Sequence, residues 1–272
     1  MLRDITIGQY YPSDSILHKL DPRVKLLGTL VYVLSLFFFR GAAGFAAVTL
    51  GLAALIWLSK VPLRYMVKGL KAIGVILVLT GMFNLFLTPG EPLASFGIFK
   101  ITEEGLKNAG FMVIRLTYLI LGSSVLTLTT TPNRLTDGLE KALRPLNKIG
   151  VPVHEISMIM SIALRFIPIL VEETDKIMKA QLARGADFES GNLIKKAKAM
   201  APLLVPLFIS AFRRANDLAM AMEARCYNGG EGRTKMKPLK YTGKDGWAYL
   251  IMAGYFAGII VCVWMSRNGR NS

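Results

Sequence analysis

Two arginines with matching neighbours are the residues most suited to specific chemistry in this sequence. Each one stands between small residues where a long amphipathic segment ends. The two groups of three residues are Ala183, Arg184 and Gly185, and Ala224, Arg225 and Cys226. A guanidinium is a planar fork of donors that fits carboxylate or carbonyl oxygens, and small neighbours leave it accessible.

A simpler interpretation exists for each arginine taken alone. A cation in the last turn of a helix interacts favourably with the helix dipole, and Gly185 is a typical C-terminal stop. The same arrangement at the ends of two helices favours a second role instead. We therefore expect both arginines to dock onto a partner protein.

Catalytic chemistry has no comparable signature in the sequence. There is no Gly-x-x-x-x-Gly-Lys-Ser/Thr phosphate loop, and the stretch Gly243-Lys-Asp-Gly lacks both the glycine spacing and the hydroxyl that such a loop needs. No serine, threonine or cysteine is recognisably paired with a base. Glu172 and Glu173 fall on the polar side of a helix, as solvated charges ordinarily do. We expect no catalytic residue and no ATP hydrolysis by this chain.

Metal and disulfide chemistry are equally unsupported. The chain has two cysteines, Cys226 and Cys262, and two histidines, His18 and His154. None of them belongs to a cluster with ligand spacing, and two cysteines make no disulfide framework. We expect no metal and no cofactor.

The composition places the chain in a membrane. Of its 272 residues 53% are hydrophobic, and the formal net charge is +15. A nucleic-acid-binding protein would also be basic, but here the basic residues lie between apolar runs long enough to cross a bilayer. The first 20 residues contain Asp4 and Asp14 and no apolar core, so we expect no cleaved signal peptide.

Five apolar runs predict five transmembrane helices. They cover residues 26–39, 45–58, 72–87, 110–130 and 247–265. Residues 60–71 hold four basic residues and no acid, which predicts a cytoplasmic loop, whereas residues 88–105 hold three glutamates and one lysine and read as external. A cytoplasmic N-terminus then puts the C-terminus outside, against the charges of Arg267 and Arg270. Arg115, inside the fourth run, is either functional or directed towards the interface.

Residues 131–246 read as a cytoplasmic domain because charged residues and prolines interrupt their apolar runs. Apolar residues recur at helical spacing from Ile156 to Gln181 and again from near Asn192 to Met222, which predicts two long amphipathic helices. We expect them to form a hairpin or a crossed pair. The predicted fold is all-α and polytopic, with a membrane part at 1–130, a coupling domain at 131–246 and a final span with its tail at 247–272.

The opening segment and the arginine motifs together resemble a known family. Residues 8–25 read Gly-Gln-Tyr-Tyr-Pro-Ser-Asp-Ser-Ile-Leu-His-Lys-Leu-Asp-Pro-Arg-Val-Lys, and Tyr227 and Arg233-Thr234 follow the second motif. The step Asp21-Pro22 within the opening segment also predicts a helix start, with Asp21 as N-cap. Over nearly its whole length the chain resembles the transmembrane T component of energy-coupling factor transporters.

The resemblance implies a function and partners. These transporters are ABC-type importers of vitamins and metal ions in the cell (inner or plasma) membrane. Two ABC-type ATPases bind the ATP, and a separate membrane-embedded S component binds the substrate. In the family, the arginine motifs end coupling helices and insert into grooves of the ATPases. That role falls here on Ala183, Arg184, Gly185, Ala224, Arg225 and Cys226, with Cys226 where glycine is common.

Two other functions fit part of the pattern. A membrane insertase would also have five spans, a basic cytoplasmic helical hairpin and an intramembrane arginine, here Arg115. The twin motifs and the opening segment speak against it.

A secondary carrier would need polar groups or broken helices near the membrane midplane, and apart from Asn84 and Arg115 the predicted spans lack them.

Overall fold

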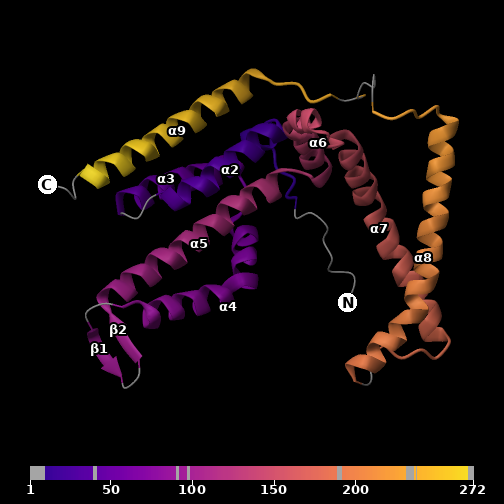
Figure 1. Ribbon diagram of the computed structural model, residues 1–272, viewed down its shortest axis with the longest axis horizontal. Coiled ribbons are helices and arrows are strands. Elements are labelled where there is room, and N and C mark those ends of the chain that lie inside the picture. The colour runs from indigo at the N-terminus through magenta and orange to yellow at the C-terminus, as the bar shows by residue number, and fades with distance from the viewer. Residues whose placement is uncertain are drawn as a thin grey trace. The chain divides into compact units, whose positions relative to one another are not determined.

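The structure is a computed structural model that describes residues 10–38, 42–89, 92–96, 99–188, 192–230, 236 and 238–268. It is built of helices and one short hairpin (Figure 1), which confirms the all-α membrane fold expected from the sequence. The chain forms two compact units. The described parts of Gly8–Leu139 and Leu239–Ser272 make the first unit, and those of Glu140–Pro238 make the second.

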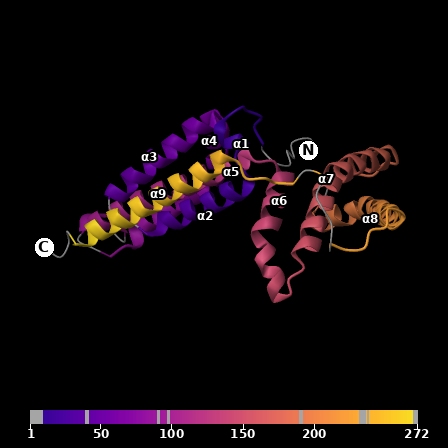
Figure 2. The ribbon, with the colours of Figure 1, turned by 90° about the horizontal axis from the view of Figure 1, so that it is seen from above.

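The first unit is a bundle of long helices with a two-stranded hairpin at one end. In Figures 1 and 2, α2, α3, α5 and α9 lie alongside one another, so the last helix of the chain packs with the first ones. Its elements are α1 (Ile16–Lys19), α2 (Pro22–Phe38), α3 (Ala42–Ser59), α4 (Leu63–Leu87), β1 (Pro92–Phe96), β2 (Phe99–Thr102), α5 (Glu103–Thr129), α6 (Pro132–Leu143), which ends in the second unit, and α9 (Gly243–Asn268).

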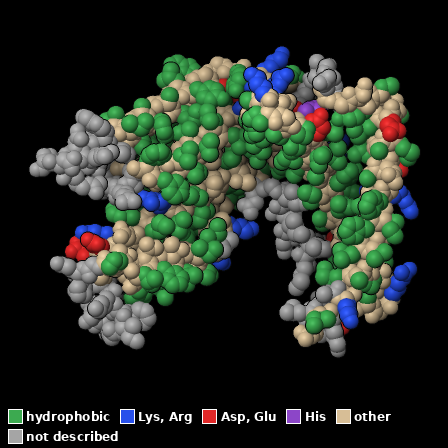
Figure 3. All heavy atoms as spheres, in the orientation of Figure 1, with side chains coloured by type: hydrophobic (Ala, Val, Ile, Leu, Met, Phe, Trp, Pro, Cys, Tyr) green, Lys and Arg blue, Asp and Glu red, His purple; other side chains and the backbone are tan. Residues whose placement is uncertain are grey.

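Two clusters of buried side chains hold this bundle together. The larger one joins α2, α3 and α9 through Leu36, Val48 and Ile259, each no more than 2% exposed. The smaller one joins the start of α4 to the end of α5 through Met66 and Val125. Outside these clusters many large apolar side chains stay exposed, and hydrophobic side chains spread over the visible face of the unit (Figure 3). Such a surface suits lipid, because a water-soluble protein rarely exposes apolar patches of this extent.

Local sequence explains where α2 and α5 begin. Asp21 is the N-cap of α2 as predicted, because its carboxylate accepts the Arg23 N–H at 2.9 Å and Pro22 occupies the first helical position. Thr102 caps α5 in the same way, accepting the Gly105 N–H at 3.0 Å. Thr102 also ends the antiparallel hairpin of β1 and β2. The sequence predicts only an external loop over residues 88–105, without strands.

Few of the helices have both the length and the apolar composition of a membrane span. Among the described residues, α5 and α7 (Val153–Ala183) are long and apolar enough to cross a membrane, and α4 adds a third if its two segments count as one span. Each of the five predicted spans coincides, over its described residues, with a helix, namely α2, α3, α4, α5 and α9. The apolar character of α7 differs from the expectation, which placed this helix in the cytoplasmic domain.

The second unit contains a 3-10 helix (Arg144–Ile149), α7 and α8 (Leu193–Ala224). The two long helices were predicted from the sequence, whereas the 3-10 helix was not. Pro202 and Pro206 lie inside α8, where each removes a backbone hydrogen bond, and α8 changes direction in its first half (Figure 1). The two long helices run in opposite directions and contact each other (Figure 1), which agrees with the prediction of a hairpin or a crossed pair.

Candidate partner-binding site

The two long helices of the second unit cross, and one ion pair joins them. The guanidinium of Arg214 on α8 donates to the Glu173 carboxylate on α7 at 3.1 Å, and both side chains are half-buried. On α7, Arg184 comes 11 residues after Glu173. On α8, Arg225 comes 11 residues after Arg214. At 1.5 Å per helical residue, each arginine lies about 16 Å along its helix from this ion pair.

The first motif forms a complete Schellman cap. Helix α7 ends at Ala183, and Gly185 takes the left-handed conformation with φ of +84°. The Gly185 N–H bonds to the Leu182 carbonyl and the Ala186 N–H bonds to the Gln181 carbonyl, both at 3.0 Å. These are the two hydrogen bonds that define the motif.

The second motif repeats the same cap. Helix α8 ends at Ala224, the Cys226 N–H bonds to the Glu223 carbonyl at 2.8 Å, and the Tyr227 N–H bonds to the Met222 carbonyl at 3.0 Å. Cys226 takes the place of Gly185 and has a φ of +56°. A side chain in this region costs roughly 1 to 2 kcal/mol. The structure therefore gives a physical reason why glycine suits this position and shows that Cys226 still adopts the required backbone.

Both motif arginines face outward. Arg184 and Arg225 are exposed, and neither guanidinium has a hydrogen bond or ion pair with any residue that the structure describes. The two capped ends lie at opposite ends of the crossed pair, because α7 and α8 run in opposite directions (Figure 1). All six predicted site residues thus fall into two copies of one local structure, and the copies do not form a single pocket.

The chain that leaves the second motif packs against the start of α7. A methyl group added to Gly230 would come within 2.3 Å of the His154 ring. Nδ1 of His154 lies 3.1 Å from a carboxylate oxygen of Glu140, and the Ser157 hydroxyl donates to the other oxygen at 2.9 Å. Sequence reasoning considered His154 only as a metal ligand and missed this contact. The two glycines Gly229-Gly230 were the available signal for a close backbone approach.

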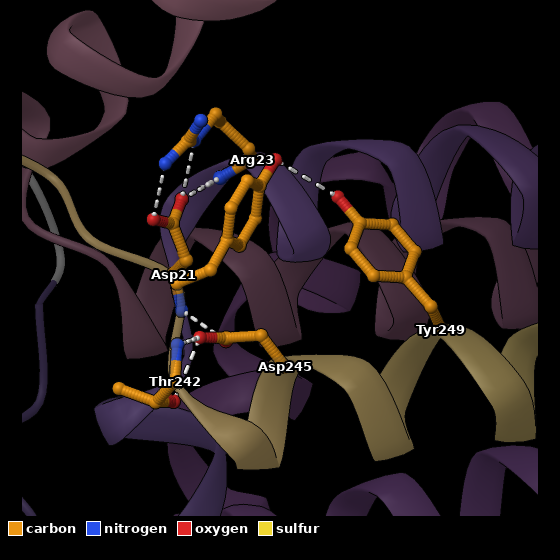
Figure 4. A network of polar contacts seen from close by, with 6 residues as sticks. Asp21, Arg23, Thr242, Asp245 and Tyr249 are labelled. Carbon is orange, nitrogen blue, oxygen red and sulfur yellow. Dashed lines mark hydrogen bonds and ion pairs between the residues drawn. The ribbon is translucent and has the colours of Figure 1, made fainter.

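The opening segment forms a network with the start of the last helix, within the first unit (Figure 4). Asp21 and Arg23 make a two-pronged ion pair, with both N···O distances 3.0 Å, and the Arg23 guanidinium lies 3.9 Å from the centre of the Tyr241 ring. The Asp245 carboxylate accepts the Asp21 N–H at 2.8 Å and the Thr242 N–H at 2.7 Å. One buried carboxylate therefore joins the N-cap residue of α2 to the start of α9.

This arrangement controls the charge of Asp245. Burial acts to raise the pKa of Asp245, but the hydrogen bonds from Asp21 and Thr242 outweigh it and hold the pKa below its ordinary value. The carboxylate is thus ionised at neutral pH, which strengthens the hydrogen bonds that it accepts. The Asp-Pro-Arg step of the opening segment has a structural task, which is to fix the first long helix to the last.

Comparison with known proteins decides the family. Residues 13–236 match the family described as cobalt transport protein, CbiQ. The chain belongs to this family. An energy-coupling factor transporter transmembrane protein EcfT from Clostridium kluyveri is 54% identical over 265 residues, which cover 97% of this chain and 96% of the relative. The EcfT of Bacillus subtilis is 49% identical over 246 residues, covering 90% and 93% of the two chains.

Membership confirms the resemblance drawn from the opening segment and the motifs. The family supplies the energy-coupling transmembrane component of energy-coupling factor transporters, and its apolar helices agree with a place in the membrane. Among the residues that the structure describes, no group of three or more histidines, cysteines or carboxylates could hold a metal ion.

Proposed function

We propose that the chain transmits the motion of two partner ATPases to a membrane-embedded S component, through Arg184 and Arg225, for the uptake of vitamins or metal ions. Partner ATPases bind and hydrolyse the ATP, and the chain itself is not catalytic. The coupling domain that carries the arginines is cytoplasmic. The observation that supports this proposal best is the repetition of one exposed, arginine-bearing Schellman cap at the ends of two crossed helices.

The cap supplies what a docking group needs. Its two backbone hydrogen bonds fix the direction in which the chain leaves the helix, so the arginine projects from a defined point. A guanidinium that has no partner among the described residues keeps its donors for another protein, where paired hydrogen bonds in a desolvated groove favour arginine over lysine. Because there are two such ends, we expect two ATPase subunits to bind, one at each arginine.

Helices α7 and α8 together can transmit motion from the ATPases. The Glu173–Arg214 ion pair joins α7 to α8, and each helix carries its motif at its C-terminal end. A displacement that brings the two ATPases together would pull on both ends at once. Because helices are stiff along their axes, this motion would pass to the start of α7 and from there, through the segments that precede α7, to the membrane helices.

Purification of the tagged full-length chain from its own membranes in mild detergent tests the assembly. We expect ATPase subunits that contain phosphate loops and one small membrane protein to co-purify. Arg184→Ala with Arg225→Ala should remove the ATPases, whereas Arg213→Ala, at another exposed arginine of α8, should not. Co-purification of ribosomes in place of ATPases would support an insertase.

The absence of a phosphate loop gives a prediction for the chain alone. Once every co-purifying ATPase has been removed, we expect neither ATP binding nor hydrolysis, because no segment of the sequence matches a phosphate loop. Hydrolysis that persists in the purified chain, and that follows its peak through size exclusion, would contradict the coupling role.

A further inference from the structure

A group of four cations on the first unit has no role in the partner-binding site. Residues 60–71 hold Lys60, Arg64, Lys68 and Lys71 and no acid. All four side chains are exposed, and none forms a hydrogen bond or ion pair with a residue that the structure describes. We refer to these four residues as the basic stripe.

Helical geometry gathers three of the four cations of the basic stripe on one side of the first segment of α4. At 3.6 residues per turn, Arg64, Lys68 and Lys71 fall within an arc of about 60°. Leu63 and Val67 border this arc and are 58% and 50% exposed, although a packed interior would bury them. The segment therefore presents cations and apolar side chains next to each other, which is the pattern of a helix that lies in a membrane interface.

The opposite side of the segment is fixed to the bundle. Met66 is fully buried and packs with Val125 and Leu128 at the end of α5. A methyl group added to Gly69 would touch the Ser124 hydroxyl at 3.7 Å. The exposed side is thus held in place by the fold.

Two aromatic residues mark the level of the interface. Trp57, in the last turn of α3, is 82% exposed, and Tyr65, on the first segment of α4, is 47% exposed. Tryptophan and tyrosine are enriched where hydrocarbon meets headgroups. Both lie within eight residues of the basic stripe along the chain.

A bend in α4 changes the direction of this segment. Leu63–Lys71 makes an angle of 62° with Ile73–Leu87, and the bend is visible in Figure 1. When the apolar segment Ile73–Leu87 crosses the bilayer, the segment before the bend inclines towards the membrane plane. An inclined amphipathic segment lays its cations along the headgroups.

We propose that the basic stripe, together with Trp57, Leu63 and Val67, binds anionic phospholipid. A phosphodiester headgroup pairs with the lysines and the arginine, and the acyl chains cover the exposed apolar side chains beside them. A soluble acidic protein would match the charges but would leave Trp57, Leu63 and Val67 in water. Free phosphate would offer no apolar part at all.

Fluorescence quenching by brominated lipid tests the proposal on the full-length chain. Trp57 is made the single tryptophan by Trp247→Phe and Trp264→Phe, and the chain is reconstituted into vesicles of phosphatidylcholine with brominated phosphatidylglycerol. Each cation near an anionic surface strengthens binding by about fivefold. We therefore expect phosphatidylglycerol to be preferred over phosphatidylcholine around Trp57 by at least about fivefold. Replacement of all four cations by glutamine should bring the preference close to one.

Matched variants separate the possible outcomes. Lys60→Arg, Lys68→Arg and Lys71→Arg together should keep the preference, as should a control that replaces Lys176, Lys179, Lys198 and Arg213 by glutamine. Raising the salt concentration should weaken the preference, and inorganic phosphate at the same ionic strength should do no more than salt does. An equal preference in the parent and the glutamine variant would overturn the proposal. So would a glutamine variant that loses ATPase co-purification and keeps its lipid preference, since the stripe would then bind protein.

Discussion

At the scale of single residues, the shared cap separates two roles for arginine that the sequence could not distinguish. A helix-dipole role needs only a positive charge in the last turn. A docking role needs the planar donor fork on an exposed, fixed end. The structure shows that Arg184 and Arg225 are exposed at such ends, so a substitution that keeps the charge and removes the fork is informative.

Arg184→Lys and Arg225→Lys should weaken ATPase association or uncouple hydrolysis from uptake. Lysine would preserve a dipole role to within a few tenths of a kcal/mol. Loss of one partner in a desolvated charged contact costs roughly 2 to 5 kcal/mol. We expect both variants to insert and fold, and the double variant to be worse than either. Parent-like assembly and transport in both lysine variants would show that the arginines are only helix caps.

The left-handed position of each cap gives a pair of opposite predictions. Cys226→Gly should stabilise the protein by up to about 1 kcal/mol, because it relieves the strain of a side chain at positive φ. Gly185→Ala should destabilise it by about the same amount, since no atom lies within 4 Å of the added methyl group and only the backbone strain counts. Thermal unfolding midpoints of the two purified variants measure both effects, and shifts of the same sign would contradict the shared cap.

At the scale of elements, the sequence predicted what periodicity encodes. The long helices α5, α7, α8 and α9 follow from apolar spacing and length, and the start of α2 follows from Asp21-Pro22. The hairpin of β1 and β2 did not, because each strand has five residues or fewer and the pairing is irregular near Pro92. The 62° bend in α4 was also missed, because this segment contains Gly69 and Gly74 but no internal proline.

Packing of α2 on α5 depends on one glycine that periodicity does not single out. A methyl group added to Gly122 would come within 2.1 Å of the Tyr32 ring, which is buried and donates its hydroxyl to the Tyr118 carbonyl at 3.0 Å. We expect Gly122→Ala to destabilise the bundle by about 1 to 3 kcal/mol, the usual cost of overpacking. The reduction should appear as a lower unfolding midpoint in detergent.

A second glycine of α5 serves as the control for Gly122. Gly110→Ala meets no atom within 4 Å of the added methyl group. It should be neutral or slightly stabilising, because alanine is the better helix former by roughly 0.5 to 1 kcal/mol. Equal midpoints for the two variants would mean that α2 and α5 do not approach each other closely at Gly122.

At the scale of the whole molecule, the candidate site was predictable as residues but not as an arrangement. Sequence named all six motif residues, because small residues around an arginine at a helix end are visible in one dimension. It could not show that α7 and α8 cross, since the Glu173–Arg214 pair joins residues 41 positions apart. It also could not connect Asp21 with Asp245, which are separated by 224 positions. Contacts of this kind depend on the packing of the helices.

The length and apolar composition of α7 make its position relative to the membrane the main question of topology. If α2, α3, α4 and α5 cross the bilayer from a cytoplasmic N-terminus, the chain returns to the cytoplasm before α6. A crossing by α7 would then carry Cys226 to the outside. The first 18 residues of α7 include Glu155 and Arg165, and five further charged residues follow between positions 172 and 179. Because a charge at the membrane centre costs roughly 2.5 to 3.5 kcal/mol, we expect α7 to remain in the cytoplasm.

Thiol labelling of intact cells tests this topology. Cys226 is a free and exposed cysteine, and we expect it to resist an impermeant reagent added outside and to react once the membrane is opened. Ser95→Cys, made together with Cys226→Ser, places a thiol in the segment between α4 and α5 and should react from outside. Cys226→Ser alone is the control, since the remaining Cys262 lies in the predicted final span. Labelling of Cys226 from outside would make α7 a transmembrane helix, put Arg225 on the wrong side for a cytoplasmic ATPase, and remove the coupling role proposed for it.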